Sequence, residues 1–294
     1  MRIGLIASTL LLIGWRDTLG QVNPDARQGP SQPSLTTDLR HRAEQGEAEA
    51  QYQLAVQLSQ IENPEDSAEA PKWFRKAAEQ GHAQAQAQVG ELYLLGMDGV
   101  DKDLQQAITW FRKAAEQGDA LGQAELAFMY ETGAGVPQNY AEAVRWYTRA
   151  ADQGLPLAQF DLAYMYENGR GVTADIEKAV HLYELAALGV PTARHNLAVL
   201  YLQGGGSVRK DPVLGYKWAV LAVSAEVQRL FHERKVDQEH RLGHALIFVE
   251  DIAKSINNSQ KRTGYRLAEE WINSNASHLG EEPRMFTTAT KKFR

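Results

Sequence analysis

Apolar residues follow a helical pattern that returns almost unchanged along the chain. In residues 73–81, WFRKAAEQG, apolar side chains fall at positions i, i+1, i+4 and i+5, and charged or polar side chains fill the others. This spacing predicts an amphipathic helix with one apolar stripe. The same nine residues return at 110–118, 37 positions later. One active site needs only one set of catalytic residues, so a repeated structural unit explains the duplication better than a catalytic motif.

A glycine closes each unit and keeps the repeats in register. Alignment on this glycine gives Gly46, Gly81, Gly118, Gly154 and Gly189, at spacings of 35, 37, 36 and 35 residues. Glycine suits the left-handed C′ position that ends many helices. A second apolar string follows each of these glycines, and in four units a glycine-valine turn comes next. Each unit is therefore predicted to be a helix, a glycine turn, a second helix and a glycine stop.

Such a helix pair cannot bury its apolar face alone, so the units are expected to stack into an all-α solenoid. The paired alanines Ala77 and Ala78 are small enough to let a neighbouring helix approach closely. After the repeats the helical pattern continues without a glycine turn, and Asn257 is expected to cap the final helix. The predicted organisation is a signal peptide at 1–20, a flexible linker at 21–36, the solenoid at 37–225, capping helices at 226–272 and a disordered tail at 273–294.

The repeated pattern AxxxLAxxYxxGxGV…A(V/I)xWYxxAAxQG, with its period of about 36 residues, resembles the Sel1-like repeat family. The related tetratricopeptide repeat has a shorter period of about 34 residues. The resemblance covers residues 39–225 and implies a right-handed α-solenoid of about five antiparallel helix pairs, which the family uses mostly as an interaction scaffold. The first unit departs from the pattern, because IENPEDSAEAP at 61–71 replaces its glycine turn.

The first twenty residues carry a different pattern. Arg2 precedes an apolar run that ends at Trp15, and the small residues Thr18 and Gly20 stand before the expected cut. These features are typical of a secretory signal peptide, and the run is shorter than the roughly twenty residues of a membrane span. We expect a periplasmic or secreted protein. Membrane attachment through an uncleaved N-terminal segment is the alternative.

Composition narrows the possible partners. The chain has 31 lysines and arginines against 37 aspartates and glutamates, for a net charge of −6. An acidic chain without a basic cluster is a poor candidate for binding nucleic acid. Since the sequence has no cysteine, disulfides, thiolate nucleophiles and cysteine metal ligands are excluded. No cofactor is expected.

Two groups of residues raise catalytic or metal hypotheses. Ser207 and Lys210 match the S-x-x-K string of penicillin-interacting serine enzymes, but they stand in a glycine-rich loop without a K-T-G or S-D-N motif. His240 and His244 are four residues apart on a predicted helix, with His232 on a similar face, but no third metal ligand accompanies them. Chance matches and solvated histidines explain these patterns better, so we expect no catalytic residue and no metal.

Positions that vary between units, while the apolar core stays fixed, indicate a binding face on the first helix of each repeat. If this face lines the concave surface, as in related repeats, it offers polar and acidic groups beside the rings of Phe128 and Tyr164, which suit partner anchors. The candidate partner-binding residues are Gln88, Glu91, Glu125, Phe128, Asp161, Tyr164 and Asn196. The recurring aromatic residues are instead expected in the core: Trp73, Trp110, Trp146, Trp218, Tyr93, Tyr130, Tyr166 and Tyr201.

The sequence therefore predicts a non-catalytic scaffold that binds a protein or peptide with basic or mixed polar segments. One alternative is a cell-envelope enzyme, acting on peptidoglycan or β-lactams through Ser207. The other is a periplasmic regulator that holds a signalling receptor inactive. It would use the same repeats and differ from the scaffold only in its partner, so the sequence does not separate the two.

Overall fold

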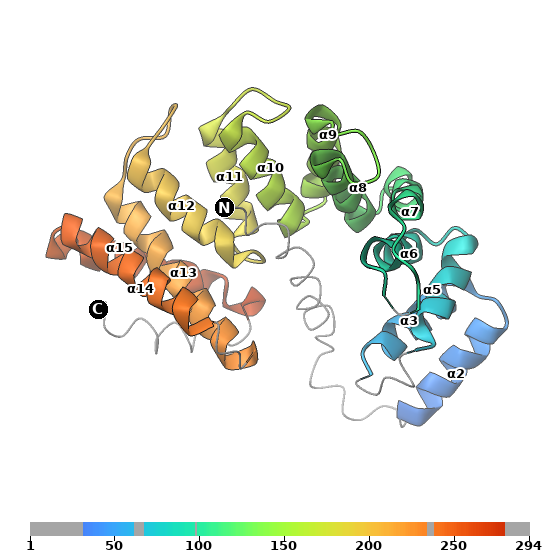
Figure 1. Cartoon of the computed structure of the whole chain (residues 1–294). Coiled ribbons are helices and arrows are strands. Elements are labelled where there is room, and N and C mark those ends of the chain that lie inside the picture. Colours follow the sequence, from blue (N-terminus) through green and yellow to red (C-terminus); the bar gives the residue numbers. More distant parts are fainter. Residues whose placement is uncertain (1–31, 62–67, 98, 234–237, 280–294) are drawn as a thin grey trace. The chain divides into compact units, whose positions relative to one another are not determined.

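The computed structural model describes residues 32–61, 68–97, 99–233 and 238–279 (Figure 1). The regular secondary structure in these ranges consists of thirteen α-helices and one short 3-10 helix. The all-α prediction is thus confirmed. The predicted signal peptide and most of the predicted linker lie outside the described residues. The chain divides within α9 into two compact units, one up to Trp146 and the other from Tyr147 onward.

In unit 1, from α2 to α8, each helix packs against the next along the chain. The first helix of each repeat (here α3, α6 and α8) alternates with a second helix (α5, α7 and α9). The elements are α2 (Gln32–Glu44), α3 (Ala48–Ser59), α5 (Ala70–Glu79), α6 (Ala83–Leu95), α7 (Leu104–Glu116), α8 (Ala120–Thr132) and the beginning of α9 (Tyr140–Asp152).

Glycine ends the second helices as the sequence predicted. Gly81 has a φ of 95°, its N–H donates to the Ala78 carbonyl at 3.0 Å, and the His82 N–H donates to the Ala77 carbonyl at 3.1 Å. This pair of bonds is a Schellman motif, which supplies donors to carbonyls that the helix leaves unpaired. The same two bonds recur around Gly118. The chain then enters the next first helix without an intervening loop.

Small residues let the helices of unit 1 approach closely. Ala77 and Ala78 are buried, as expected. A Cβ atom added to Gly122 would lie 2.5 Å from the Cβ of Ala114, on the preceding helix α7. A Cβ atom added to Gly90 would lie 2.6 Å from the Phe111 ring. At these two positions the helices therefore lie too close together for a larger side chain to fit.

A buried glutamine, one per repeat, ties each first helix of unit 1 to the preceding helix. We call these residues the glutamine row. Each Nε2 donates to a carbonyl eight residues earlier, at the end of the preceding helix, where carbonyls lack helical partners. The pairs are Gln51 with Ala43 at 3.0 Å, Gln86 with Ala78 at 3.2 Å and Gln123 with Ala115 at 3.2 Å. Gln86 also accepts a hydrogen bond from Gln117 at 2.7 Å.

Unit 2 continues the helix pairs and ends in the capping helices. Its elements are the rest of α9, α10 (Pro156–Asn168), α11 (Ile176–Ala186), α12 (Pro191–Gln203), α13 (Pro212–Glu233), α14 (Gln238–Ser255), α15 (Asn258–Ser274) and a 3-10 turn (Ala276–His278). Both α14 and α15 pack against α13 (Figure 1). Asn257 caps α15 in a capping box with Gln260, which confirms the N-cap prediction.

The structure moves two of the predicted boundaries. Helix α2 begins at Gln32, so the end of the segment predicted as a linker is helical. At the other end, α15 continues to Ser274 and Leu279 is buried, so the predicted tail contributes to the fold through residue 279. Composition missed both boundaries, because polar and small residues also occur in helix ends. Residues 280–294 lie outside the described residues.

In the last repeat an arginine replaces the glutamine of the row. Arg194 is only 1% exposed, and its Nε donates to the Ala187 carbonyl at 2.9 Å. Its Nη1 reaches further than an amide and donates to the Leu221 carbonyl of α13 at 3.2 Å. The guanidinium carbon lies 4.8 Å from the ring centre of Trp271 on α15, a cation–π contact. One side chain therefore joins α12 to both α13 and α15.

We expect Gln86→Ala to lower the free energy of unfolding by about 1–3 kcal/mol, because it removes one of the two donors to the Ala78 carbonyl and an acceptor of the Gln117 amide. Gln84→Ala is the control, since Gln84 is exposed on the same helix; its change should stay within about 0.5 kcal/mol. Urea unfolding followed by circular dichroism measures both. Equal losses would contradict a structural role for the glutamine row.

Arg194→Gln restores the usual residue of the row but gives up the contacts with Leu221 and Trp271. We expect faster amide hydrogen exchange across α15 and a loss of about 1.5–3 kcal/mol in the unfolding free energy, the range for a hydrogen bond to a charged group. Arg266→Gln, on the exposed side of α15, removes only a surface ion pair with Glu270 and should leave the exchange of α15 nearly unchanged. Unchanged exchange in Arg194→Gln would show that α15 does not depend on it.

Candidate functional site

In each unit the first helices have a partly exposed side, and we call this side the first-helix face of that unit. All seven predicted partner-binding residues lie on it, and all are half-buried, so each leaves part of its side chain accessible. Unit 1 carries Gln88, Glu91, Glu125 and Phe128, and unit 2 carries Asp161, Tyr164 and Asn196. Their role in binding remains a prediction.

Charge is unevenly divided between the two kinds of helix. The five first helices (α3, α6, α8, α10 and α12) hold no lysine and a single arginine, Arg194, which is buried. They carry the carboxylates Glu49, Glu91, Glu125, Glu131, Asp161 and Glu167. The second helices α5, α7, α9 and α11 carry lysine or arginine in every case. The first helices therefore carry more negative than positive charge of their own.

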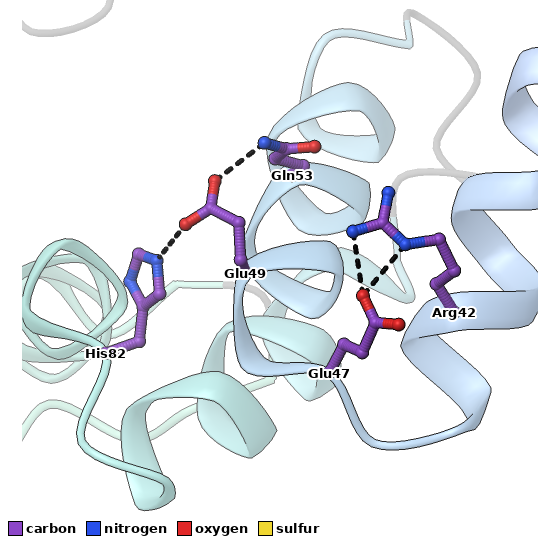
Figure 2. Close-up of polar contacts among 5 residues, drawn as sticks. All are labelled: Arg42, Glu47, Glu49, Gln53 and His82. Carbon is purple, nitrogen blue, oxygen red and sulfur yellow. Dashed lines mark hydrogen bonds and ion pairs between the residues drawn. The ribbon is translucent and has the colours of Figure 1, made fainter.

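At the start of unit 1 this face holds a polar cluster, drawn in Figure 2. One oxygen of Glu49 lies 2.9 Å from Nε2 of His82, and the other accepts a hydrogen bond from Gln53 at 2.6 Å. Nδ1 of His82 accepts from the Ala85 N–H at 3.3 Å, so the ring proton that faces Glu49 is on Nε2. The His82 ring stacks on Tyr52 with centroids 4.5 Å apart. The cluster thus links α3 to the N-terminus of α6.

Carboxylates of this region differ in their electrostatic surroundings. The hydrogen bond from His82 is the main reason why the pKa of Glu49 is lowered. In the next repeat Asp119 caps α8 by accepting from the Gly122 N–H at 2.7 Å. Burial nevertheless raises the pKa of Asp119, since desolvation outweighs that bond and the attraction of His82. Arg42 and Glu47 form a separate exposed ion pair at 2.7 Å (Figure 2).

In unit 2 the first-helix face is tied into a hydrogen-bonded network. The buried Tyr183 hydroxyl donates to Glu167 at 2.7 Å, and Asn196 contributes a further hydrogen bond to that hydroxyl. Burial is the main cause of the raised pKa of Tyr183, and the charge of Glu167 adds to it. The Phe160 ring lies 5.4 Å from the Tyr183 ring. Asn196 therefore has a structural partner as well as an accessible edge.

The rings of unit 2 show where its face is accessible. The Arg170 guanidinium lies 5.0 Å from the Tyr164 ring centre, so a cation already covers part of this half-buried ring. On the last first helix, His195 meets Phe248 of α14 with centroids 4.8 Å apart. The capping helix α14 thus contacts the last first helix, α12.

The recurring aromatic residues only partly follow the core prediction. Trp73, Trp146 and Trp218 are buried, but Trp110 and the four tyrosines are half-buried. Each tyrosine packs its ring while its hydroxyl reaches a charged side chain of a second helix. The hydroxyl contacts are Arg75 with Tyr93 and Arg112 with Tyr130 at 3.4 Å, Lys178 with Tyr166 at 2.8 Å and Tyr201 with Glu184 at 3.1 Å.

The catalytic and metal hypotheses find little support. The Ser207 side chain is exposed on the turn after α12, and its hydroxyl bonds to the Glu177 carboxylate at 2.5 Å. Within the described residues no three histidines, aspartates or glutamates are grouped to hold a metal ion. His244 is exposed, whereas the side chains of His232 and His240 lie outside the described residues.

Sequence reasoning missed the glutamine row, the His82 cluster and the role of Arg194. The glutamines were visible, because Gln51, Gln86, Gln123 and Gln159 hold the same place after each glycine stop. They were not predicted as core because glutamine is usually a surface residue. The partners of His82 come from other helices, and no local pattern indicates them.

These features define the protein as an α-solenoid built from paired-helix repeats. A family model described as Sel1 repeat matches five times, at residues 48–82, 83–119, 120–155, 156–189 and 191–226. The chain belongs to the Sel1 repeat family. Members of this family are generally protein-interaction scaffolds and are typically non-catalytic.

Two solved structures are similar. Protein c5321, a protective antigen of uropathogenic Escherichia coli with an SLR fold, is 30% identical with a TM-score of 0.71, over 88% of this chain and 51% of that one. The present chain thus spans about half the length of that protein. A Sel1 repeat protein of Oxalobacter formigenes is 32% identical with a TM-score of 0.57, over 73% of this chain and 84% of that one. No curated protein matches. No helix in the described ranges is both long and apolar enough to cross a membrane.

We expect His82→Asn to return the pKa of Glu49 toward its ordinary value, because the ring that bonds the carboxylate is gone. Asparagine is a good N-cap, so α6 should keep its first turn. Carboxyl-carbon NMR during an acid titration measures the change. Glu69, whose pKa is lowered by Arg40, serves as the control and should titrate as in the unmodified protein. An unchanged Glu49 would mean that His82 does not hold it.

The sign of this shift also sets the pH dependence of stability. Since the folded pKa of Glu49 is below its unfolded value of 4.5, its contribution is complete above that pH and disappears as the pH falls through the folded pKa. Glu49 contributes to the difference in unfolding free energy between the unmodified protein and His82→Asn. This contribution should therefore shrink below pH 4.5.

Proposed function

We propose that this chain is a non-catalytic scaffold that binds a protein or peptide on its first-helix face. The observation that carries the proposal is the division of charge, with carboxylates and almost no cations on the first helices. Membership of the Sel1 repeat family supports an interaction role in general. Phe128 and Tyr164, half-buried on this face, supply ring surface for anchoring a partner.

The chemistry of the face favours a partner with basic or mixed polar segments. Glu91 and Glu125 in unit 1 and Asp161 in unit 2 offer negative charge beside the rings. Attraction between exposed charges is screened by salt, so electrostatic binding weakens as ionic strength rises. An apolar partner would show little dependence on salt.

The proposed location is outside the cytoplasm. The support is the pattern of residues 1–20, with one arginine, a short apolar run and small residues before position 21. Cell fractionation, followed by N-terminal sequencing of the protein from each fraction, tests this part separately. Recovery of the chain from the cytoplasmic fraction with residue 1 retained would overturn it.

Pull-down from an envelope extract tests the binding proposal. The immobilised full chain should retain a partner, identified by mass spectrometry, that about 500 mM salt releases. Phe128→Ala and Tyr164→Ala, tested one at a time, identify the unit involved, and loss of an anchor should reduce recovery about fivefold or more. Leu185→Ala is the control, because Leu185 is exposed on the second helix α11.

The outcomes separate the possible sites. A partner lost with Phe128→Ala or Tyr164→Ala, and kept with Leu185→Ala, supports the first-helix face. Equal recovery with all three would overturn the proposed site. Circular dichroism of each variant confirms that a loss does not reflect unfolding.

A further inference from the structure

Unit 1 carries a set of exposed cations on its second helices that no local sequence cluster indicates. We call Arg75, Lys76, Arg112 and Lys113 the basic row. All four are exposed, and each pair occupies the same two positions of consecutive second helices, α5 and α7. The row therefore repeats a basic surface on a chain with a net charge of −6.

Aromatic rings hold these cations in place without neutralising them. Each arginine lies against a tyrosine of the next first helix, with Arg75 and Arg112 both 3.4 Å from the hydroxyl that they contact. Lys76 lies 4.0 Å from the Trp73 ring centre, and Lys113 lies 4.1 Å from that of Trp110. Across the described ranges, no carboxylate lies within 4.0 Å of a nitrogen of the four, although Glu79 and Glu116 follow on the same helices. The positive charge is available to a partner.

The first helices of the same unit carry the complementary charge. Repeats one to three place Glu49, Glu91 and Glu125 on the first-helix face, and α3, α6 and α8 contain neither lysine nor arginine. Both surfaces are built from consecutive repeats, but the three carboxylates do not occupy the same position of their helices, as the cations do. A second copy of this chain therefore presents the basic row with a surface of opposite sign.

We propose that the first-helix face of unit 1 in one copy docks on the basic row of unit 1 in another. This inference rests on the proposed function in one respect, because both proposals use the acidic first-helix face as a binding surface. The contact joins two different surfaces, so it is heterologous. Each copy that docks through its basic row leaves its own acidic face unoccupied, and a further copy can dock there. Exposed charges attract weakly and are screened, so the assembly forms at high protein concentration and dissolves in salt. A basic partner competes with it for the same face.

The fold itself shows that reversing the arginines is tolerable. Arg75 and Glu184 each stand two residues before a paired alanine, in repeats one and four. In repeat four the Tyr201 hydroxyl bonds to Glu184 at 3.1 Å. Glutamate in place of Arg75 or Arg112 thus leaves the neighbouring tyrosine with an acceptor. The variant Arg75→Glu/Arg112→Glu is expected to fold.

Sedimentation velocity of the full chain, from about 5 to about 200 µM, tests the proposal. At about 20 mM salt the average sedimentation coefficient should rise with concentration, and at about 500 mM salt it should stay at the monomer value. Arg75→Glu/Arg112→Glu should remain monomeric at low salt. Lys254→Glu/Arg262→Glu, which makes the same charge change at exposed positions of α14 and α15, should associate like the unmodified chain.

Mixing two reversed variants gives the sharpest test. Glu91→Lys/Glu125→Lys should also be monomeric alone, because both of its faces are then basic. Mixed in equal amounts with Arg75→Glu/Arg112→Glu, it should associate again, since each pairing brings opposite charges together. An unmodified chain that stays monomeric, or an arginine variant that associates as strongly, would overturn the proposal. If either occurs while a partner is still retained on the first-helix face, the proposed function stands and only self-docking fails.

Discussion

The fold depends on a hydrogen bond between a buried glutamine side chain and the end of the preceding helix. Close contact between small residues such as Ala114 and Gly122 brings successive repeats together, and it also buries carbonyls that the helix leaves without partners. Gln86 donates to the Ala78 carbonyl, which also accepts from the Gly81 N–H, and Gln86 is itself held by Gln117. Since a buried amide without partners is costly, these bonds help to set the position of one helix against the next. The position of each helix in turn decides which residues of the first helices stay accessible on the first-helix face.

The end of the array shows how the same constraint terminates a solenoid. Arg194 makes the bond of the glutamine row and, being longer and charged, also engages Leu221 and the Trp271 ring. The last repeat is covered by capping helices instead of another repeat, and it differs from the others at the position of the glutamine row. A terminal unit needs such a cover, because its apolar face would otherwise stay exposed.

The arrangement separates two tasks within each repeat. Alanines, glycines and the glutamine row hold the helices together, and they leave the outer positions free to vary. The first helices α3, α6, α8 and α10 carry carboxylates, and in repeats one and two the second helices carry exposed cations. Unit 1 therefore carries opposite charges on its two kinds of helix.

The sequence by itself determined the helix pairs, the glycine stops at Gly81 and Gly118 and the cap at Asn257, because helix ends and amphipathic stripes are local properties. It also placed Phe128 on an accessible face, since helical spacing decides which residues share a side. Only the tertiary structure decided the partners of Gln86, His82 and Arg194, which lie on other helices. It also showed that tyrosines such as Tyr93 are half-buried against cations. Contacts between distant segments depend on how the helices pack, and no spacing along the chain encodes that packing.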